Sequence, residues 1–364
     1  MLVSEIETPA ILVDLDVMDR NLSRMADYCR RTNLRLRPHT KTHKIPELAQ
    51  RQIASGAQGI TVAKIGEAEV MADAGITDIF IAYPLVGFRK AERLAQLAGR
   101  ANISVALDSE DVARAISNEF SSKGVRVGVL VELDVGFGRC GVANGQDLLA
   151  LAQKITALPG LDFKGFMFFP GNFQVEEQER ARLLTRVNEL LSDSLSKLEQ
   201  AGIPVTIVSG GSTPSAYEGH LFCGVNEIRP GMYIFNDRNM LGVGVAQAED
   251  CALSVITTVV STSVSGRAIV DGGSKTFSSD RYQAGDGRGF GKVREDAEAE
   301  FESQSEEHGH LNIKHSSRQY KVGDRLTIIP NHACSTVNMH DEIYGTRDDR
   351  VETIWKVLGR GKIR

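Results

Sequence analysis

Short apolar runs alternate with helix-forming segments from residue 11 to about residue 235. Strands that alternate with helices are typical of a parallel sheet. Roughly eight such units within about 230 residues favour a closed (β/α)8-type barrel over an open doubly wound sheet. The expected strands are, in chain order, ILVDL, LRLRPH, GITVAK, IFIAY, ISVALD, VRVGVLVELDV, FKGFMFF, VTIVSGG and IRPGMYIF.

The helical spacing fades after residue 240, and a second, antiparallel pattern begins. The segments CALSVITTVVSTSV, GRAIVDGG, GDRLTIIP and VETIWKVLGRGKIR predict antiparallel strands joined by turns. Residues 294–317 are charged and poor in apolar side chains, so we expect an exposed loop there. We predict an α/β fold with a barrel over residues 9–240 and a C-terminal antiparallel β domain over residues 241–364. Residues 1–8 are expected to belong to this β domain as well.

The composition is that of an ordinary cytoplasmic protein that acts on small molecules. Its 42 basic and 47 acidic residues are mixed along the chain and give a net charge of −5, without a basic face for nucleic acid. No apolar run approaches the ~20 residues that span a bilayer, and no signal peptide is recognisable at the start. Five irregularly spaced cysteines argue against a disulfide framework.

A cluster of cationic and imidazole side chains follows the second expected strand. Residues 37–44 read RPHTKTHK and contain Lys41 and His39. Crowded cations can lower the pKa of a lysine, which leaves an amine free to form a Schiff base with an aldehyde. The alternative is a basic surface loop that binds an anion.

Two glycine-containing segments later in the barrel are candidates for phosphate binding. Residues 209–214 read SGGSTP between an expected strand and a helix, so their backbone N–H groups and hydroxyls could hold a phosphate. Residues 229–233 read RPGMY and could add another amide. An ordinary turn is the alternative in both places.

The pair His332 and Cys334 is a candidate metal site in the second domain. The two side chains lie two positions apart after the strand LTIIP, so an extended segment places them on the same side. Nitrogen and sulfur ligands suit Zn²⁺ or another borderline divalent metal. A purely structural His-x-Cys pair is the alternative.

Eight segments together resemble the D-threonine aldolase and D-serine dehydratase family, whose members are pyridoxal-phosphate enzymes with an alanine-racemase-like fold. The similarity extends in order over nearly the whole chain. The segments are TPAILVDLD, RPHTKTHK, ELDVGFGRCGV, SGGSTPS, IRPGMYIFND, VDGGSK, EEHGHL and PNHACSTVNMHD.

The resemblance implies specific roles for residues of this chain. Lys41 would carry pyridoxal 5'-phosphate, with His39 as a further catalytic candidate, and Arg139 would lie near the phenolic oxygen of the cofactor and the substrate carboxylate. Arg229 matches an arginine that faces the pyridine nitrogen, and its own high pKa prevents it from protonating that nitrogen. The phosphate would be held by residues of the two glycine-containing segments, namely Gly211, Ser212, Thr213, Gly231, Met232 and Tyr233.

Family members also bind a divalent metal (Zn, Mn or Mg) at the position of His332 and Cys334, where it contacts the β-hydroxyl of the substrate. One segment departs from the family: residues 169–172 read FPGN where related aldolases carry Tyr-His-Gly, and Val175 replaces a common histidine. This departure removes polar acid/base groups but none of the residues expected to bind the cofactor.

The expected activity is a metal-assisted lyase reaction on D-3-hydroxy amino acids. Retro-aldol cleavage to glycine and an aldehyde is the main interpretation, and dehydration of D-serine or D-3-hydroxyaspartate to a 2-oxo acid and ammonia is the alternative. An amino-acid racemase fits Arg229 but does not need a metal pair. A non-catalytic cofactor carrier would lack the C-terminal β domain. The resemblance further suggests a homodimer.

Overall fold

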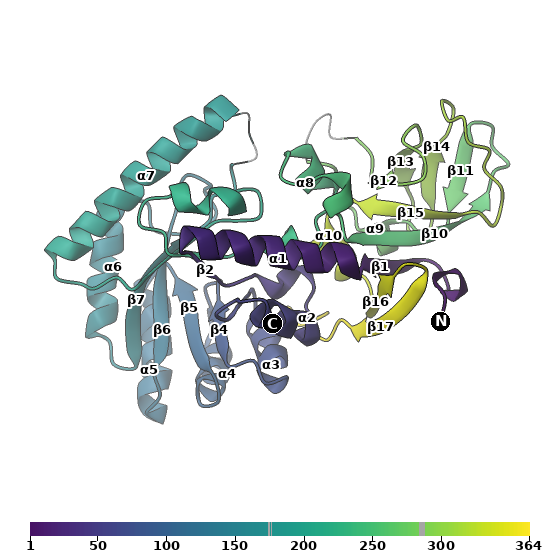
Figure 1. The fold of residues 1–364 in the computed structure, drawn as a ribbon. Helices are drawn as coiled ribbons and strands as arrows, with labels where there is room; N and C mark the ends of the chain where they lie inside the picture. Colours follow the sequence, from purple (N-terminus) through teal and green to yellow (C-terminus); the bar gives the residue numbers. More distant parts are fainter. Residues whose placement is uncertain (174, 176, 284–287) are drawn as a thin grey trace. The chain divides into compact units, whose positions relative to one another are not determined.

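The computed structural model describes residues 1–173, 175, 177–283 and 288–364. The chain folds into two compact units (Figure 1). One consists of residues 25–41, 46–231 and 362–364, and is called the barrel unit here. The other consists of residues 1–24, 42–45 and 232–361, and is called the β unit. The predicted domain division at residue 240 remains a prediction.

The barrel unit is built on eight parallel strands. In spatial order they are β2 (Arg35–Leu36), β9 (Glu227–Ile228), β8 (Ile207–Gly210), β7 (Leu161–Phe168), β6 (Val127–Leu133), β5 (Asn102–Leu107), β4 (Asp78–Ile81) and β3 (Ile60–Val62). The residues after β2 also pair with β3, since Thr61 N–H donates to Pro38 O at 2.8 Å. This pairing closes the ring that the sequence predicts.

Helices follow most of these strands and cover the outside of the ring. They are α2 (Pro46–Ala54), α3 (Ile65–Asp73), α4 (Phe88–Ala98), α5 (Glu110–Lys123), α6 (Gly145–Ala157) and α7 (Glu177–Gln200), and α1 (Leu15–Thr32) runs from the β unit into the barrel unit. Alternate strand residues pack under the helices, whereas Phe80, Ala106, Leu130 and Met167 form a separate apolar layer. Because strand side chains alternate, Glu132 lies on the same strand face as Leu130.

The β unit contains a nine-stranded, mostly antiparallel sheet. Its spatial order is β11 (Arg267–Val270), β14 (Gly309–Asn312), β13 (Glu300–Gln304), β12 (Gly291–Val293), β15 (Arg325–Pro330), β10 (Leu253–Ser261), β1 (Ala10–Asp14), β16 (Glu342–Arg347) and β17 (Arg350–Lys356). β11 also pairs with β10, which closes six strands into a small barrel. Short helices α8 (Arg238–Gly242), α9 (Ser274–Phe277) and α10 (Ala333–Val337) connect parts of this unit.

Two local expectations are wrong. The run ILVDL forms β1, which pairs with β10 and β16 instead of joining the parallel ring. The charged stretch 294–317 is not a loop, since it contains β13 and β14. Phe301 and Leu311 are fully buried at facing positions of that hairpin, and a single inward apolar side chain per strand is enough to anchor it.

Within the residues that the structure describes, no helix is both long enough and apolar enough to cross a membrane.

Candidate active site

The loop after β2 carries Lys41 at the carboxyl end of the parallel strands. One backbone bond and one side-chain bond fix this loop: His39 N–H donates to Pro230 O at 3.0 Å, and Thr40 Oγ1 donates to Thr61 O at 3.2 Å. Lys41 lies in a single 3-10 turn and is exposed. Its backbone N–H donates to Nδ1 of His39 at 3.3 Å, so Nδ1 is the acceptor nitrogen of that ring.

His39 is buried among cations. Burial, followed by the charges of Lys41, Arg229 and Arg139, lowers the pKa of His39 well below its ordinary value of 6.5. The imidazole is therefore neutral at physiological pH. Lys41, Arg229 and Arg139 come from three different loops, and all three act on the pKa of His39.

Arg139 lies at the open end of β6 and is half exposed. Its guanidinium is 3.7 Å from the buried carboxylate of Glu132 and stacks at 4.5 Å on the ring of Phe169. Burial raises the pKa of Glu132, although Arg139 and Arg229 oppose this effect. Phe169 belongs to the FPGN segment, so this segment places an aromatic ring against the arginine.

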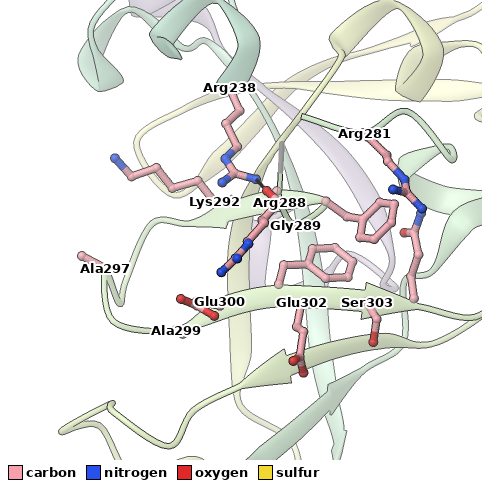
Figure 2. Close-up of a pocket in the computed structure, with 14 residues that line it drawn as sticks. Arg238, Arg281, Arg288, Gly289, Lys292, Ala297, Ala299, Glu300, Glu302 and Ser303 are labelled. Carbon is pink, nitrogen blue, oxygen red and sulfur yellow. Dashed lines mark hydrogen bonds between the residues drawn. The ribbon is translucent and has the colours of Figure 1, made fainter. Parts of the chain in front are cut away.

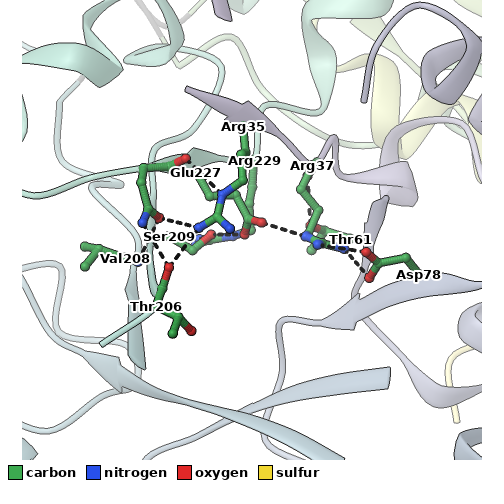
Figure 3. A network of polar contacts seen from close by, with 10 residues as sticks. Arg35, Arg37, Thr61, Asp78, Thr206, Val208, Ser209, Glu227 and Arg229 are labelled. Carbon is green, nitrogen blue, oxygen red and sulfur yellow. Dashed lines mark hydrogen bonds and ion pairs between the residues drawn. The ribbon is translucent and has the colours of Figure 1, made fainter. Parts of the chain in front are cut away.

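Arg229 is buried at the end of a chain of polar contacts (Figure 3). It donates from Nη1 to Ser209 Oγ at 2.6 Å and from Nη2 to Phe168 O at 2.9 Å. Ser209 in turn donates to Glu227 at 2.6 Å. Burial lowers the pKa of Arg229 to about 10, so the guanidinium still carries its charge at neutral pH.

The chain of contacts continues across the ring to β4. Glu227 accepts from Arg37 Nε at 2.8 Å, and Arg37 also binds Asp78 with both Nη atoms at 2.7 and 3.2 Å. Burial alone would lower the pKa of Arg37, but Glu227 and Asp78 outweigh it and raise that pKa. Sequence reasoning missed Glu227 and Asp78 and included Ser209 only in the candidate phosphate segment 209–214, because each becomes a partner in this network only when distant strands meet.

The two glycine-containing segments lie next to each other. Gly231 N–H donates to Thr213 Oγ1 at 3.2 Å, which joins the loop after β8 to the loop after β9. Gly211 has a φ of +87°, a backbone conformation that favours glycine. Ser212 is half buried and its hydroxyl lies 3.3 Å from that of Ser215. Met232 and Tyr233 begin a 3-10 turn that belongs to the β unit.

The pair His332 and Cys334 lies in the β unit, where β15 leads into α10. His332 has extended backbone at the helix N-cap, and Ala333 N–H donates to the buried carboxylate of Asp237 at 2.9 Å. His332 Nδ1 donates to Asp280 Oδ2 at 2.7 Å, and Cys334 hydrogen-bonds His332. Burial alone would lower the pKa of His332, but Cys334 and the two carboxylates outweigh it and raise that pKa.

Two side chains that could bind a metal are therefore hydrogen-bonded to each other, and the histidine is also bonded to a carboxylate. Such an outer carboxylate is typical of metal-binding histidines, because it fixes the ring and leaves the other nitrogen for the ion. Among the described residues, no group of three His, Cys, Asp or Glu side chains is arranged to hold a metal. The pair could supply two ligands and leave the remaining positions to water or substrate. Asp280 lies in none of the sequence motifs, so sequence reasoning did not identify it as a partner of His332.

Comparisons with known proteins identify the family of this chain. Residues 13–239 match the model of the alanine racemase N-terminal domain, and residues 252–346 match that of a putative serine dehydratase domain. The chain therefore belongs to the alanine racemase N-terminal domain family, in the group of lyases that also carry the dehydratase domain. The expected resemblance, fold class and enzyme class are confirmed.

Three relatives illustrate the similarity. A D-threonine aldolase of Arthrobacter sp is 34% identical over 98% of this chain and 94% of its own length. The crystal structure of a D-threonine aldolase from Filomicrobium marinum has a TM-score of 0.92 and 34% identity, covering 99% and 98% of the two chains. The D-threo-3-hydroxyaspartate dehydratase from Delftia sp. HT23 has a TM-score of 0.91 and 32% identity, covering 98% of each chain. A cysteine-to-alanine variant of such a dehydratase is known in a metal-free form.

Proposed function

We propose that this protein is a pyridoxal-phosphate- and metal-dependent lyase that cleaves D-3-hydroxy amino acids of the D-threonine type into glycine and an aldehyde. The observation that carries the proposal is the cluster of Lys41, Arg139 and Arg229 around a neutral His39. This cluster lies in a chain that is similar to D-threonine aldolases over nearly its whole length.

The residues at the barrel mouth fit the implied cofactor. Lys41 is an exposed residue that carries a primary amine, the surrounding arginines favour an anionic ligand, and the two loops joined by Thr213 and Gly231 present hydroxyls for a phosphate. Lys41 would hold the cofactor covalently, and Ser212 would contact its phosphate. When bound, pyridoxal phosphate supplies an electron sink for bond breakage at Cα.

The three side chains around Lys41, namely His39, Arg139 and Arg229, would have different roles in the reaction. Arg139 is half exposed and charged, so it suits the substrate carboxylate. His39 is neutral and its lowered pKa makes it a weak base, so it would position the loop of Lys41 by accepting from the backbone N–H of that residue. Arg229 donates hydrogen bonds but does not release its proton at neutral pH, so it would stabilise the unprotonated form of a facing ring nitrogen.

His332 and Cys334 would hold the divalent metal, with Asp280 fixing the imidazole. A metal there would polarise the β-hydroxyl of the substrate and lower its pKa. The metal-free form of the cysteine-to-alanine dehydratase variant supports this assignment by similarity. The thiol and the ring nitrogen are soft and borderline ligands, which favours zinc over magnesium.

The reaction is balanced without any further reactant. The hydroxyl loses its proton as the Cα–Cβ bond breaks, acetaldehyde leaves, and Cα takes up one proton to give glycine. Incubation of the holoenzyme with D-threonine should yield glycine and acetaldehyde in equal amounts, and a chelator should stop the reaction. Formation of L-allo-threonine alone, as from a racemase, would overturn the proposal. The matched control is Lys41→Ala, which should form neither product.

Dehydration is the second candidate, and the similarity to the Delftia dehydratase over 98% of both chains favours it. Here Cα loses its proton and the hydroxyl leaves as water; the resulting enamine becomes an imine, which one solvent water hydrolyses, so D-threonine would give 2-oxobutanoate and ammonia. The same incubation distinguishes the two reactions, because only dehydration releases ammonia.

We also propose a homodimer in the cytoplasm. The dimer follows from similarity to the family, and the location follows from composition. Light scattering of the purified protein and fractionation of the source cells test these two statements separately.

A further inference from the structure

Two phenylalanine rings lie against the guanidinium of Arg139 in the barrel unit. The central carbon of the guanidinium is 4.5 Å from the ring centre of Phe169 and 5.4 Å from that of Phe137. The two rings meet edge to face, with their centres 5.3 Å apart and their planes at 78°. Both distances to the cation are within the ~6 Å over which an aromatic ring attracts a guanidinium. Phe137 and Phe169 are called the aromatic pair here.

The loop that carries Phe137 and Arg139 is fixed at its base. Oδ1 of Asp134 accepts from the backbone N–H groups of residues 136–138 at 3.0, 2.9 and 3.1 Å. Beyond the arginine the loop returns to its start, since Asp134 N–H donates to Val142 O at 2.9 Å. One ring of the aromatic pair and the cation are therefore presented by the same short segment.

Gly171 leaves room for the aromatic pair. A Cβ on residue 171 would lie 2.5 Å from Cε1 of Phe169 and 2.7 Å from Cδ2 of Phe137, which is closer than real Cβ atoms approach. The backbone of Gly171 is outside the left-handed region, so an alanine would act through this contact and not through strain. A methyl group there has to displace at least one of the rings.

The other contacts of Arg139 leave its side chain considerable freedom. The side chain is 50% exposed, and its ion pair with Glu132 is 3.7 Å long. The thiol of Cys140 also hydrogen-bonds it. A long side chain loses much rotamer freedom when a ligand fixes it, and this loss weakens binding. Rings that already fix the guanidinium reduce the loss.

We propose that Phe169 and Phe137 are positioning residues that hold Arg139 for the carboxylate of the substrate. This inference rests on the proposed function, in which Arg139 binds that carboxylate. An aromatic ring accepts no conventional hydrogen bond, so it holds the cation without using the N–H groups that a carboxylate needs. Loss of the rings should raise KM and change kcat little, because the carboxylate is bound in the substrate and in the transition state alike.

D-Alanine and D-alaninol are matched probes, because both carry the amine and only D-alanine carries a carboxylate. Binding of each to the holoenzyme can be followed by the absorbance of the bound cofactor. Phe169→Leu and Phe137→Leu should each weaken D-alanine by about two- to fivefold, as loss of an exposed cation–π contact does, and leave D-alaninol unchanged. The double variant should weaken D-alanine by roughly tenfold. Gly171→Ala should act in the same direction although both rings remain. KM for D-threonine should rise by the same factors.

Rescue and control variants separate positioning from general damage. Phe169→Tyr and Phe137→Tyr keep the rings and should bind D-alanine like the wild type. Phe88→Leu removes an exposed phenylalanine of the same unit and should change neither probe. Lys292→Gln removes a cation from the wall of a cavity of about 780 Å³ in the β unit (Figure 2). The described lining of that cavity contains none of the residues around Lys41, so this variant should also bind D-alanine like the wild type.

In an Arg139→Gln background, loss of the rings should have no further effect on D-alanine, since the cation that they hold is gone. Equal D-alanine binding by the wild type and the double leucine variant would overturn the proposal. Equal losses for both probes, tyrosine variants as weak as the leucine variants, or an undiminished effect in the Arg139→Gln background would overturn it too.

A failure of the proposed function is distinguishable from these outcomes. If Arg139→Gln itself does not weaken D-alanine, then Arg139 does not bind the carboxylate, and its assigned role and the positioning proposal fail together. If D-threonine gives no glycine while the two probes respond as expected, only the lyase assignment fails.

Discussion

His332 and Asp280, which are 52 residues apart in sequence, share a hydrogen bond of 2.7 Å between Nδ1 and Oδ2. This bond sets the ring orientation and leaves Nε2 to face a second partner. Cys334 also hydrogen-bonds the same histidine, so the nitrogen and the thiol are already grouped for an ion. The carboxylate is therefore as much a part of the proposed metal site as the two ligands.

Asp280→Asn should weaken metal binding without removing a ligand. Loss of an outer-shell partner costs about 10–100-fold in metal affinity. Metal titration of the chelated protein should show this decrease, and excess metal should restore lyase activity. Asp349→Asn, an exposed aspartate of the same unit, should titrate like the wild type. Equal affinities for Asp280→Asn and wild type would show that the pair does not bind the metal.

His332→Ala and Cys334→Ala should each abolish cleavage of a β-hydroxy substrate while cofactor remains bound, because the ligand pair and Lys41 are separate in sequence and role. If the metal acts only on the hydroxyl, exchange of the α-proton of D-alanine should survive both variants and chelation. Exchange is measured by NMR in deuterated buffer. Joint loss of exchange and cleavage would mean that the metal maintains the structure of the site.

Borohydride reduction of the holoenzyme should fix the cofactor to Lys41. The absorbance of the bound cofactor should disappear, and peptide mass spectrometry should find the adduct on Lys41. Lys44 is the internal control, since it is buried and donates to Asn338 Oδ1 at 2.8 Å. An adduct on Lys44 would contradict the assignment.

His39 should make the stability of the protein fall in acid. Its folded pKa lies well below 6.5, so the unfolded chain binds a proton that the folded chain does not. The free energy of unfolding should therefore fall as pH decreases below about 6.5, by up to about 1.4 kcal/mol per pH unit from this group. Urea unfolding of cofactor-free His39→Gln should show a correspondingly smaller slope. His308→Gln, at an exposed histidine, should keep the wild-type slope.

Arg229→Gln should change the spectrum of the bound cofactor and increase side transamination relative to cleavage, because a neutral amide replaces a fixed cation. Removing the guanidinium also leaves Ser209 and the Phe168 carbonyl without a buried donor, at a cost of about 1–3 kcal/mol each. Ser209→Ala is the matched control for the structural part, since it perturbs the same contacts but keeps the cation. Equal spectra and product ratios for Arg229→Gln and wild type would refute a role at the cofactor.

Local pattern was sufficient for most of the main elements of this protein and for marking candidates for its chemistry, whereas the proposed reaction came from the resemblance to a family. Strand and helix periodicity identified the parallel ring. Apolar residues alternate along a strand and recur at every third to fourth position along a helix, so both elements can be recognised from the order of residues. Lys41 was recognisable as a candidate because other reactive groups lie beside it in sequence, and the same is true of His332 and Cys334. Groups that are close in sequence remain close in space. The resemblance then added Arg139 and Arg229, which no spacing rule connects to Lys41.

Tertiary structure decided which strands pair and which distant groups meet. The run ILVDL is equally apolar for either sheet, and only its bonds to β10 and β16 place β1 in the β unit. The charged hairpin of β13 and β14 became visible only through the burial of Phe301 and Leu311. Asp280 and Glu227 lie 52 and 190 residues from His332 and Arg37, so long-range pairing of backbone segments had to occur before their charges could interact.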